Sequence, residues 1–178
     1  MDKQFEALRA LGAGDFQHLN GSLEAHLKGT ESILAAWGSD EILRLAGLFH
    51  AAYGTAGFDE QMVSLLQRES ISAIIGGDAE ALVYLYCSCD RDYVFPQFGN
   101  AETIQFLDRF SGSLFVLSKE QANRFCALTV ANELELVHAS DEFKNKHGLE
   151  LLALFECMDR YLSLEAKEAY KSALIEFT

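Results

Sequence analysis

Proline and cysteine are both scarce in this chain, and each scarcity narrows what the protein can be. The single proline, Pro96, leaves long stretches open to helix, because proline is the strongest helix breaker. The four cysteines form no Cys-x-x-Cys pair. Cys87 and Cys89, two residues apart on an expected helix, point to different faces and suit neither a disulfide nor a zinc site. We therefore expect reduced thiols that pack as small hydrophobic side chains in a cytoplasmic protein.

Basic residues and long apolar runs are also few. The chain has 14 Lys and Arg against 27 Asp and Glu, a net charge of −13, and no basic cluster. Such a chain repels phosphate backbones and anionic lipid surfaces, so we expect neither nucleic acid nor a membrane as partner. The longest apolar runs, such as Ala81–Cys87, are far too short to span a bilayer, and the first residues lack the pattern of a secretion signal.

Helical periodicity is what the sequence contains in quantity. Hydrophobic residues make up 49% of the chain and no repeat or linker divides it, so we predict one all-α domain over residues 1–178. Ser118–Gln121 is a capping box, and Leu114–Leu117 predicts a short strand. Apolar spacing, glycine stops and polar N-caps predict helices over residues 3–11, 22–37, 40–53, 79–92, 119–139, 141–161 and 164–177, with helical periodicity also at 60–66.

Two histidines carry the main functional signal. His26 and His50 each lie on the apolar face of a predicted helix, and the short connection at Gly38 makes those two helices antiparallel neighbours. A buried imidazole needs partners for its ring nitrogens, and imidazole is the commonest metal ligand. Each histidine is either a satisfied structural residue or part of a shared site, which would hold a divalent transition metal such as Fe, Mn or Zn.

A carboxylate from another helix would complete such a site. Asp90 follows Leu82 by eight residues and Tyr86 by four, so it is expected on their inward stripe; the alternative is a helix-terminal acid in an ion pair. Glu80 and Glu135 are the reserve candidates.

Four further polar residues are expected to line the pocket. Tyr53, Glu80 and Arg91 would orient a small substrate. A phosphorylated substrate is compatible with the acidic chain, because a metal and one arginine can bind phosphate locally. Asn132 lies on the apolar face of the long helix and either closes a hydrogen-bond network or enters the site. His18, in a loop, either adds a ligand or lies at the surface. The partner is therefore expected to be a small molecule, and the oligomeric state is open.

The segments Leu23–Leu27, Leu45–His50 and Ile75–Val83 follow one another in the order of a first histidine, a second histidine-bearing helix and a later helix. Together they resemble the core of the HD-domain superfamily, in particular the hydrolase domain of guanosine-tetraphosphate hydrolases. The likeness covers about Ser22–Asp92 and implies an HD-domain-like helical bundle with His26, His50 and Asp90 in the ligand positions. The residue after His50 is Ala51, where that family has its signature Asp.

Three functional hypotheses follow. Without the signature Asp, two histidines and one carboxylate would hold a single ion with open positions, which implies a single-metal enzyme of phosphohydrolase or oxygenase type. Ala51 equally fits a non-catalytic HD-like module that binds a small ligand or a partner in the degenerate pocket. A third hypothesis is a pure assembly partner with an apolar patch near Tyr93–Phe115.

Overall fold

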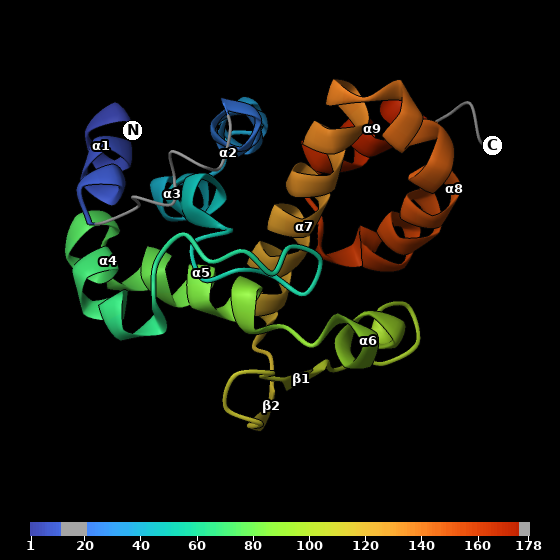
Figure 1. The fold of residues 1–178 in the computed structure, drawn as a ribbon. Helices are drawn as coiled ribbons and strands as arrows, with labels where there is room; N and C mark the ends of the chain where they lie inside the picture. Colours follow the sequence, from blue (N-terminus) through green and yellow to red (C-terminus); the bar gives the residue numbers. More distant parts are fainter. Residues whose placement is uncertain (12–20, 175–178) are drawn as a thin grey trace. The chain divides into compact units, whose positions relative to one another are not determined.

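The computed structural model describes residues 1–11 and 21–174, and most of these residues are helical (Figure 1). The chain divides into two compact units, Met1–Cys89 and Asp90–Thr178. The predicted helical class is confirmed, except that the second unit contains a two-stranded ribbon. The HD-like arrangement and the single domain over residues 1–178 stay predictions. Within the described part of the chain, no helix combines the length and hydropathy needed to cross a bilayer.

The first unit is built from helices joined by turns. Every one of its helices contributes to a buried core, for example Leu8, Leu34, Phe49, Ile71 and Val83, each fully shielded from solvent. Its elements are α1 (Asp2–Ala10), α2 (Gly21–Ala36), α3 (Glu41–Phe49), the 3-10 turn η2 (Leu65–Gln67), α4 (Arg68–Ile75) and α5 (Gly77–Ser88).

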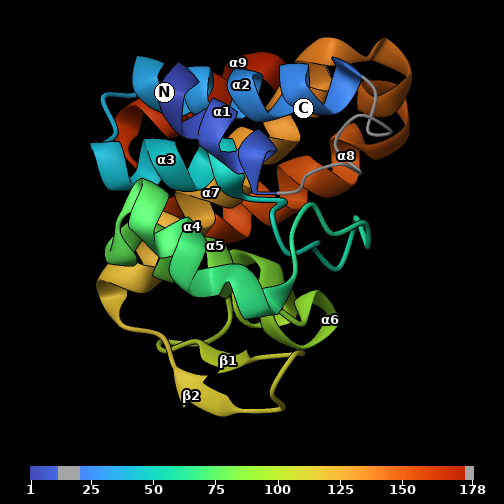
Figure 2. The ribbon, with the colours of Figure 1, turned by 60° about the vertical axis from the view of Figure 1, so that its left-hand side comes forward.

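The α2–α3 pair forms as the sequence predicts. Gly38 reverses the chain with a φ of 70°, and the Asp40 side chain accepts the Leu43 N–H at 2.9 Å, which caps α3. The two helices lie side by side and run in opposite directions (Figure 2). They approach closely at Gly47, where a Cβ would stand 2.6 Å from Leu34 Cδ1. A small residue at that position therefore sets the spacing between the two histidine-bearing helices.

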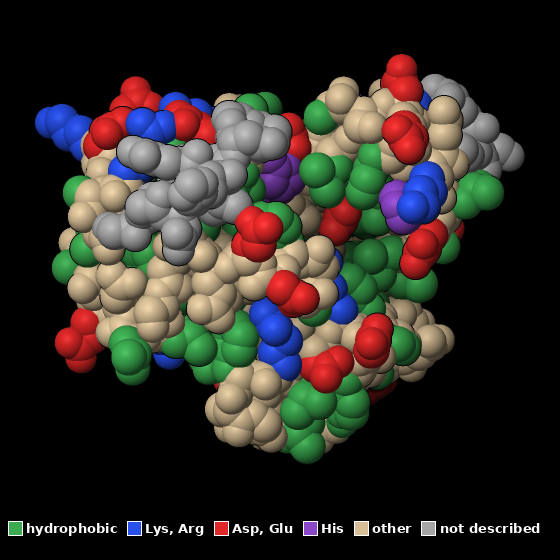
Figure 3. Space-filling view, in the orientation of Figure 1, with side chains coloured by type: hydrophobic (Ala, Val, Ile, Leu, Met, Phe, Trp, Pro, Cys, Tyr) green, Lys and Arg blue, Asp and Glu red, His purple; other side chains and the backbone are tan. Residues whose placement is uncertain are grey.

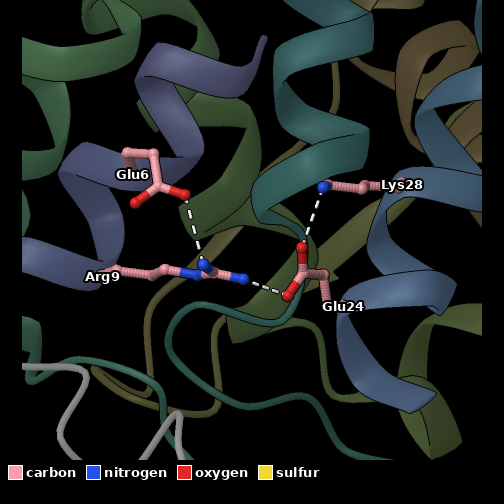
Figure 4. Close-up of polar contacts among 4 residues, drawn as sticks. All are labelled: Glu6, Arg9, Glu24 and Lys28. Atoms are coloured by element: carbon pink, nitrogen blue, oxygen red, sulfur yellow. Dashed lines mark hydrogen bonds and ion pairs between the residues drawn. The ribbon is translucent and has the colours of Figure 1, made fainter. Parts of the chain in front are cut away.

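An ion-pair network joins α1 to α2 (Figure 4). Glu24 of α2 accepts from Arg9 of α1 and from Lys28, the latter at 2.8 Å, and Arg9 also contacts Glu6 at 3.2 Å. The Lys28 ammonium lowers the pKa of the Glu24 carboxyl, and the Arg9 charge adds to the effect. Because these side chains are largely hydrated, the network orients α1 more than it stabilises the unit.

Two predicted helix ends are wrong in the first unit. α3 ends at Phe49 instead of residue 53, because the Ala52 N–H turns back to the Phe49 carbonyl at 2.9 Å in a tighter turn. α5 ends at Ser88 instead of residue 92, since Cys89 is extended with φ −66° and ψ 120°.

Residues 60–66, which show helical periodicity in the sequence, do not form a helix over most of that range. Met62 and Val63 are buried, and both of their N–H groups bond to the Ala52 carbonyl at 3.0 Å. Their apolar spacing reflects a buried loop that folds back on the turn after α3. Regular helix resumes only at η2 and α4.

In the second unit, the predicted capping box is confirmed. The Ser118 hydroxyl accepts the Gln121 N–H at 3.1 Å, and the Gln121 side chain accepts the Ser118 N–H at 2.9 Å. The predicted strand is confirmed as β2, whereas β1 was not predicted, and residues 175–177 of the last predicted helix lie outside the described residues. The elements are α6 (Arg91–Val94), η3 (Phe95–Gln97), β1 (Gln105–Leu107), β2 (Leu114–Val116), α7 (Lys119–Ala139), α8 (Asp141–Met158), η4 (Asp159–Tyr161) and α9 (Leu164–Leu174).

An aromatic core holds the second unit together. Phe98 stacks on Phe125 with ring centroids 6.3 Å apart, and Phe106 meets Phe125 edge-on at 6.1 Å. The four cysteines are free thiols, and the predicted packing as small hydrophobic side chains is confirmed for Cys87, Cys89 and Cys126, which are buried. It is wrong for Cys157, which is exposed.

Candidate metal-binding site

His26 and His50 lie together in the first unit. Their ring centroids are 5.1 Å apart and their planes are inclined by 81°. His50 is 3% exposed, while His26 is partly accessible to solvent. His26 lies within α2 and His50 is the C-cap residue of α3, so the antiparallel helix pair brings them to one place. The sequence prediction of two facing imidazoles is therefore confirmed.

The surroundings of His50 fix the orientation of its ring and the tautomer of the neutral form. Its Nδ1 lies 2.7 Å from the Gly47 carbonyl oxygen, which can only accept, so the proton of the neutral ring is on Nδ1 and the lone pair on Nε2. Tyr86 lies edge-on to the ring at 5.7 Å, and the Cys87 thiol donates to the His50 carbonyl at 3.0 Å. A histidine that donates Nδ1–H to a backbone carbonyl is the usual arrangement of a metal ligand bound through Nε2.

The spacing of the two rings fits a shared ion. With metal–nitrogen bonds of about 2.0–2.1 Å and tetrahedral angles, two imidazoles on one ion have ring centres roughly 5 Å apart. Among the residues that the structure describes, however, no group of three or more His, Cys, Asp or Glu side chains is arranged to hold a metal. His18, the loop histidine of the sequence prediction, lies outside the described residues. The described residues thus supply a pair of nitrogen ligands and not a full coordination shell.

Tyr53 and Glu80, predicted to line the pocket, are buried and form a polar cluster with the partly exposed Arg68. The Tyr53 hydroxyl donates to Glu80 Oε1 at 2.8 Å. The Arg68 guanidinium binds the same carboxylate through two hydrogen bonds, from Nε to Oε1 at 2.7 Å and from Nη2 to Oε2 at 2.9 Å. The Arg68 guanidinium also stacks 3.7 Å from the Tyr84 ring centre.

The electrostatics of this cluster favour a fixed charge pair. Burial, reinforced by the bond to Glu80, raises the pKa of the Tyr53 phenol far above its ordinary value of 10.0, so Tyr53 remains a donor. The Glu80 carboxylate likewise raises the pKa of Arg68. Sequence reasoning placed Tyr53 and Glu80 at the pocket but missed Arg68 as their partner.

The remaining predicted residues belong to the second unit. The Asp90 side chain accepts the Tyr93 N–H at 3.1 Å and caps α6, so the argument that placed it on the inward stripe of the preceding helix is wrong. Arg91 pairs with Glu133 of α7 at 3.7 Å, and the Asn132 side chain donates to the same Glu133 at 3.2 Å. This contact agrees with the prediction that Asn132 closes a hydrogen-bond network, the first of the two alternatives. Whether Asp90, Arg91 or Asn132 serves the histidine pair stays a prediction.

Comparison with known proteins adds one finding. A family model described as a domain of unknown function (DUF6817) matches residues 7–91, the stretch that contains both histidines. No curated protein and no solved structure matches the chain.

Proposed function

We propose that the first unit binds one divalent transition metal, Fe, Mn or Zn, through His26 and His50. The observation that supports it most directly is the pair of imidazoles 5.1 Å apart, one of them with its Nδ1–H on a backbone carbonyl. The partial exposure of His26 gives an ion and a small molecule a route to the pair. The resemblance to HD domains, which carry ligands at the same two positions, points the same way.

The enzyme that follows from this site is a single-metal hydrolase or oxygenase of a small molecule. A bound ion would act as a Lewis acid or activate water or oxygen. His26 and His50 would hold it, and Tyr86 together with the Gly47 carbonyl would fix the plane and the tautomer of His50. Water would occupy the open positions, because the described residues place no third His, Cys, Asp or Glu beside the two histidines.

A second candidate is a non-catalytic module that binds a small ligand. It is favoured by Ala51, which is 3% exposed and puts a methyl group where HD domains have their signature carboxylate. It is also favoured by Tyr53 and Glu80, whose polar atoms are bonded to each other and to Arg68. Those side chains are thereby committed to holding α4, α5 and the turn after α3 together.

Elemental analysis of the full chain purified without chelators tests the metal proposal. We expect about one equivalent of a transition metal in the wild type, because a metal held by a folded protein site dissociates too little to be lost during purification. His26→Ala and His50→Ala should each lose it while keeping the helical far-ultraviolet signal. His138→Ala is the matched control, because His138 is exposed at the end of α7.

The two candidates give different results. Wild type that stays folded but takes up none of the three metals contradicts the metal proposal and leaves the non-catalytic module. Metal that persists in both histidine variants places the ion elsewhere and contradicts the site. His18→Ala shows whether the loop histidine belongs to the same shell.

A further inference from the structure

The two-stranded ribbon of the second unit has an outer edge formed by β2 (Figure 2). The Leu117 N–H bonds to the Ile104 carbonyl at 2.9 Å. Ile104 and Leu117, which lie opposite each other just beyond the ribbon, are therefore a hydrogen-bonded pair. Bonded and non-bonded pairs alternate in an antiparallel ladder. By this alternation the pairs Gln105–Val116 and Leu107–Leu114 are non-hydrogen-bonded. The N–H and C=O groups of Val116 and Leu114 therefore point away from β1.

The side chains of β2 are unusually apolar for an edge. Phe115 is 38% exposed and shares a face of the ribbon with the buried Phe106, with the two ring centres 5.1 Å apart. Leu114 is 55% exposed and Val116 57% exposed on the opposite face of the ribbon. Figure 3 shows hydrophobic side chains gathered at the lower edge of the view, where Figure 1 draws β2. Natural proteins usually protect such an edge with a charged residue or a proline, and β2 has neither.

The absence of charge around β2 indicates which kind of partner its edge suits. The nine residues 110–118 contain no charged side chain, whereas the whole chain carries −13. A second copy of so acidic a chain is repelled wherever carboxylates face it, and a neutral strip is where two copies can meet at least cost. A basic partner would find no carboxylate on this strip to bind.

We propose that β2 pairs antiparallel with β2 of a second copy of this chain, about a two-fold axis at Phe115. In that register Leu114 of one copy lies opposite Val116 of the other, and the outward backbone groups of both residues meet as bonded pairs. Phe115 meets its own copy at a non-bonded position, as the alternation requires. The two ribbons then form one four-stranded sheet, which is more stable than an isolated pair of strands.

Paired charges at positions 114 and 116 test this register in the full-length protein. Leu114→Lys with Val116→Lys places like charges opposite each other twice, and Leu114→Glu with Val116→Lys places opposite charges there. Sedimentation velocity over the micromolar range should find a dimer in the wild type. The lysine pair should weaken it by about tenfold or more, and the Glu–Lys pair should restore much of the loss.

Each other result overturns the proposal. A wild type that is monomeric throughout that range has no such interface. A dimer that survives the lysine pair unchanged associates through another surface, and equal losses in the two double variants exclude the proposed register. Because both positions are exposed, the variants should keep the wild-type thermal midpoint within about 2 °C, which confirms that they fold.

Discussion

Glu80 shows how one buried carboxylate is made tolerable. Ionised groups are costly to bury unless every oxygen is paired. The Tyr53 hydroxyl and both arms of the Arg68 fork pair the oxygens of Glu80, whose side chain is only 7% exposed. The carboxylate therefore joins α5 to α4 and to the turn that follows His50.

Glu80→Gln should lower the free energy of unfolding by about 1.5–3 kcal/mol, the usual contribution of a hydrogen bond to a charged partner. The amide keeps the shape of the side chain but loses the charge that Arg68 binds. Glu120→Gln is the control: its carboxylate pairs with Arg124 at 76% exposure, so it should change stability by no more than about 0.5 kcal/mol. Urea unfolding measures both, and equal effects would mean that Glu80 is no better paired than a surface group.

The sequence allows the histidine pair to be predicted but not the polar cluster. His26 and His50 are found because their helices keep a 3.6-residue period up to each ring. The Tyr53–Glu80–Arg68 contacts depend on where the chain turns after Phe49, and helical spacing that continues through Ala51 and Ala52 hides that turn. Pairing across a turn of this kind is decided by tertiary contacts and not by local periodicity.

At the scale of elements, a helix boundary is predicted well from the sequence where side chains cap it. It is predicted poorly where the backbone simply becomes extended. Ser118 with Gln121 places the start of α7 correctly, because both side chains bond backbone groups within the same four residues. The end of α5 has no such signal: Cys89 becomes extended and Asp90 caps the next helix, although neither residue is a strong breaker. β1 escapes prediction because three residues are too few to show an alternation.

Gly99 joins η3 to the next segment under two constraints. Its φ is 86°, in the left-handed region, and a Cβ there would lie 3.1 Å from Cys157 Sγ. Gly112 has a φ of 74° but nothing within 4 Å. Gly112→Ala should thus lower the free energy of unfolding by about 1–2 kcal/mol, through backbone strain alone. Gly99→Ala should lower it by about 1 kcal/mol or more beyond that, because its Cβ also crowds Cys157. Thermal unfolding of the two variants checks the difference, and equal midpoints would mean that Cys157 moves aside freely.

Asp159 ties η4 to α9 and should make the second unit sensitive to acid. Partial burial opposes its charge, but bonds from Lys167 at 3.0 Å and from Tyr170 at 2.9 Å outweigh that effect and lower its pKa below 3.8. A carboxyl with a lowered folded pKa stabilises the protein above its unfolded pKa and loses that contribution as the pH falls through the folded value.

Asp159→Asn should therefore be less stable than the wild type at neutral pH, and the gap should close as the pH drops below 3.8. Urea unfolding at a series of pH values gives this comparison directly. A gap that stays constant down to the lowest pH would show that the loss comes from packing and not from the charge of Asp159.

At the scale of the whole molecule, the sequence offers no sign of a boundary between the two units. No run of Gly, Pro or Ser precedes Asp90, so composition alone predicts one domain. Each of the two units contains buried hydrophobic residues of its own, from α1–α5 in the first and including Phe98, Phe125 and Phe155 in the second. The family match to residues 7–91 covers nearly the same stretch as the first unit.

The first unit should fold without the second. A fragment of residues 1–89 retains all of α1–α5 and the contacts of α5 with α3 and α4, so it should show a helical far-ultraviolet spectrum and one cooperative unfolding transition. Its stability will be low, since chains of this size bury a smaller fraction of their surface than larger domains do. Residues 1–75 make the matched control. That fragment lacks Val83 and Tyr86, which are buried, and Glu80, which holds Arg68, so it should not unfold cooperatively. If residues 1–89 are as unstructured as residues 1–75, the core of the first unit depends on the rest of the chain, and the two units are one cooperative domain.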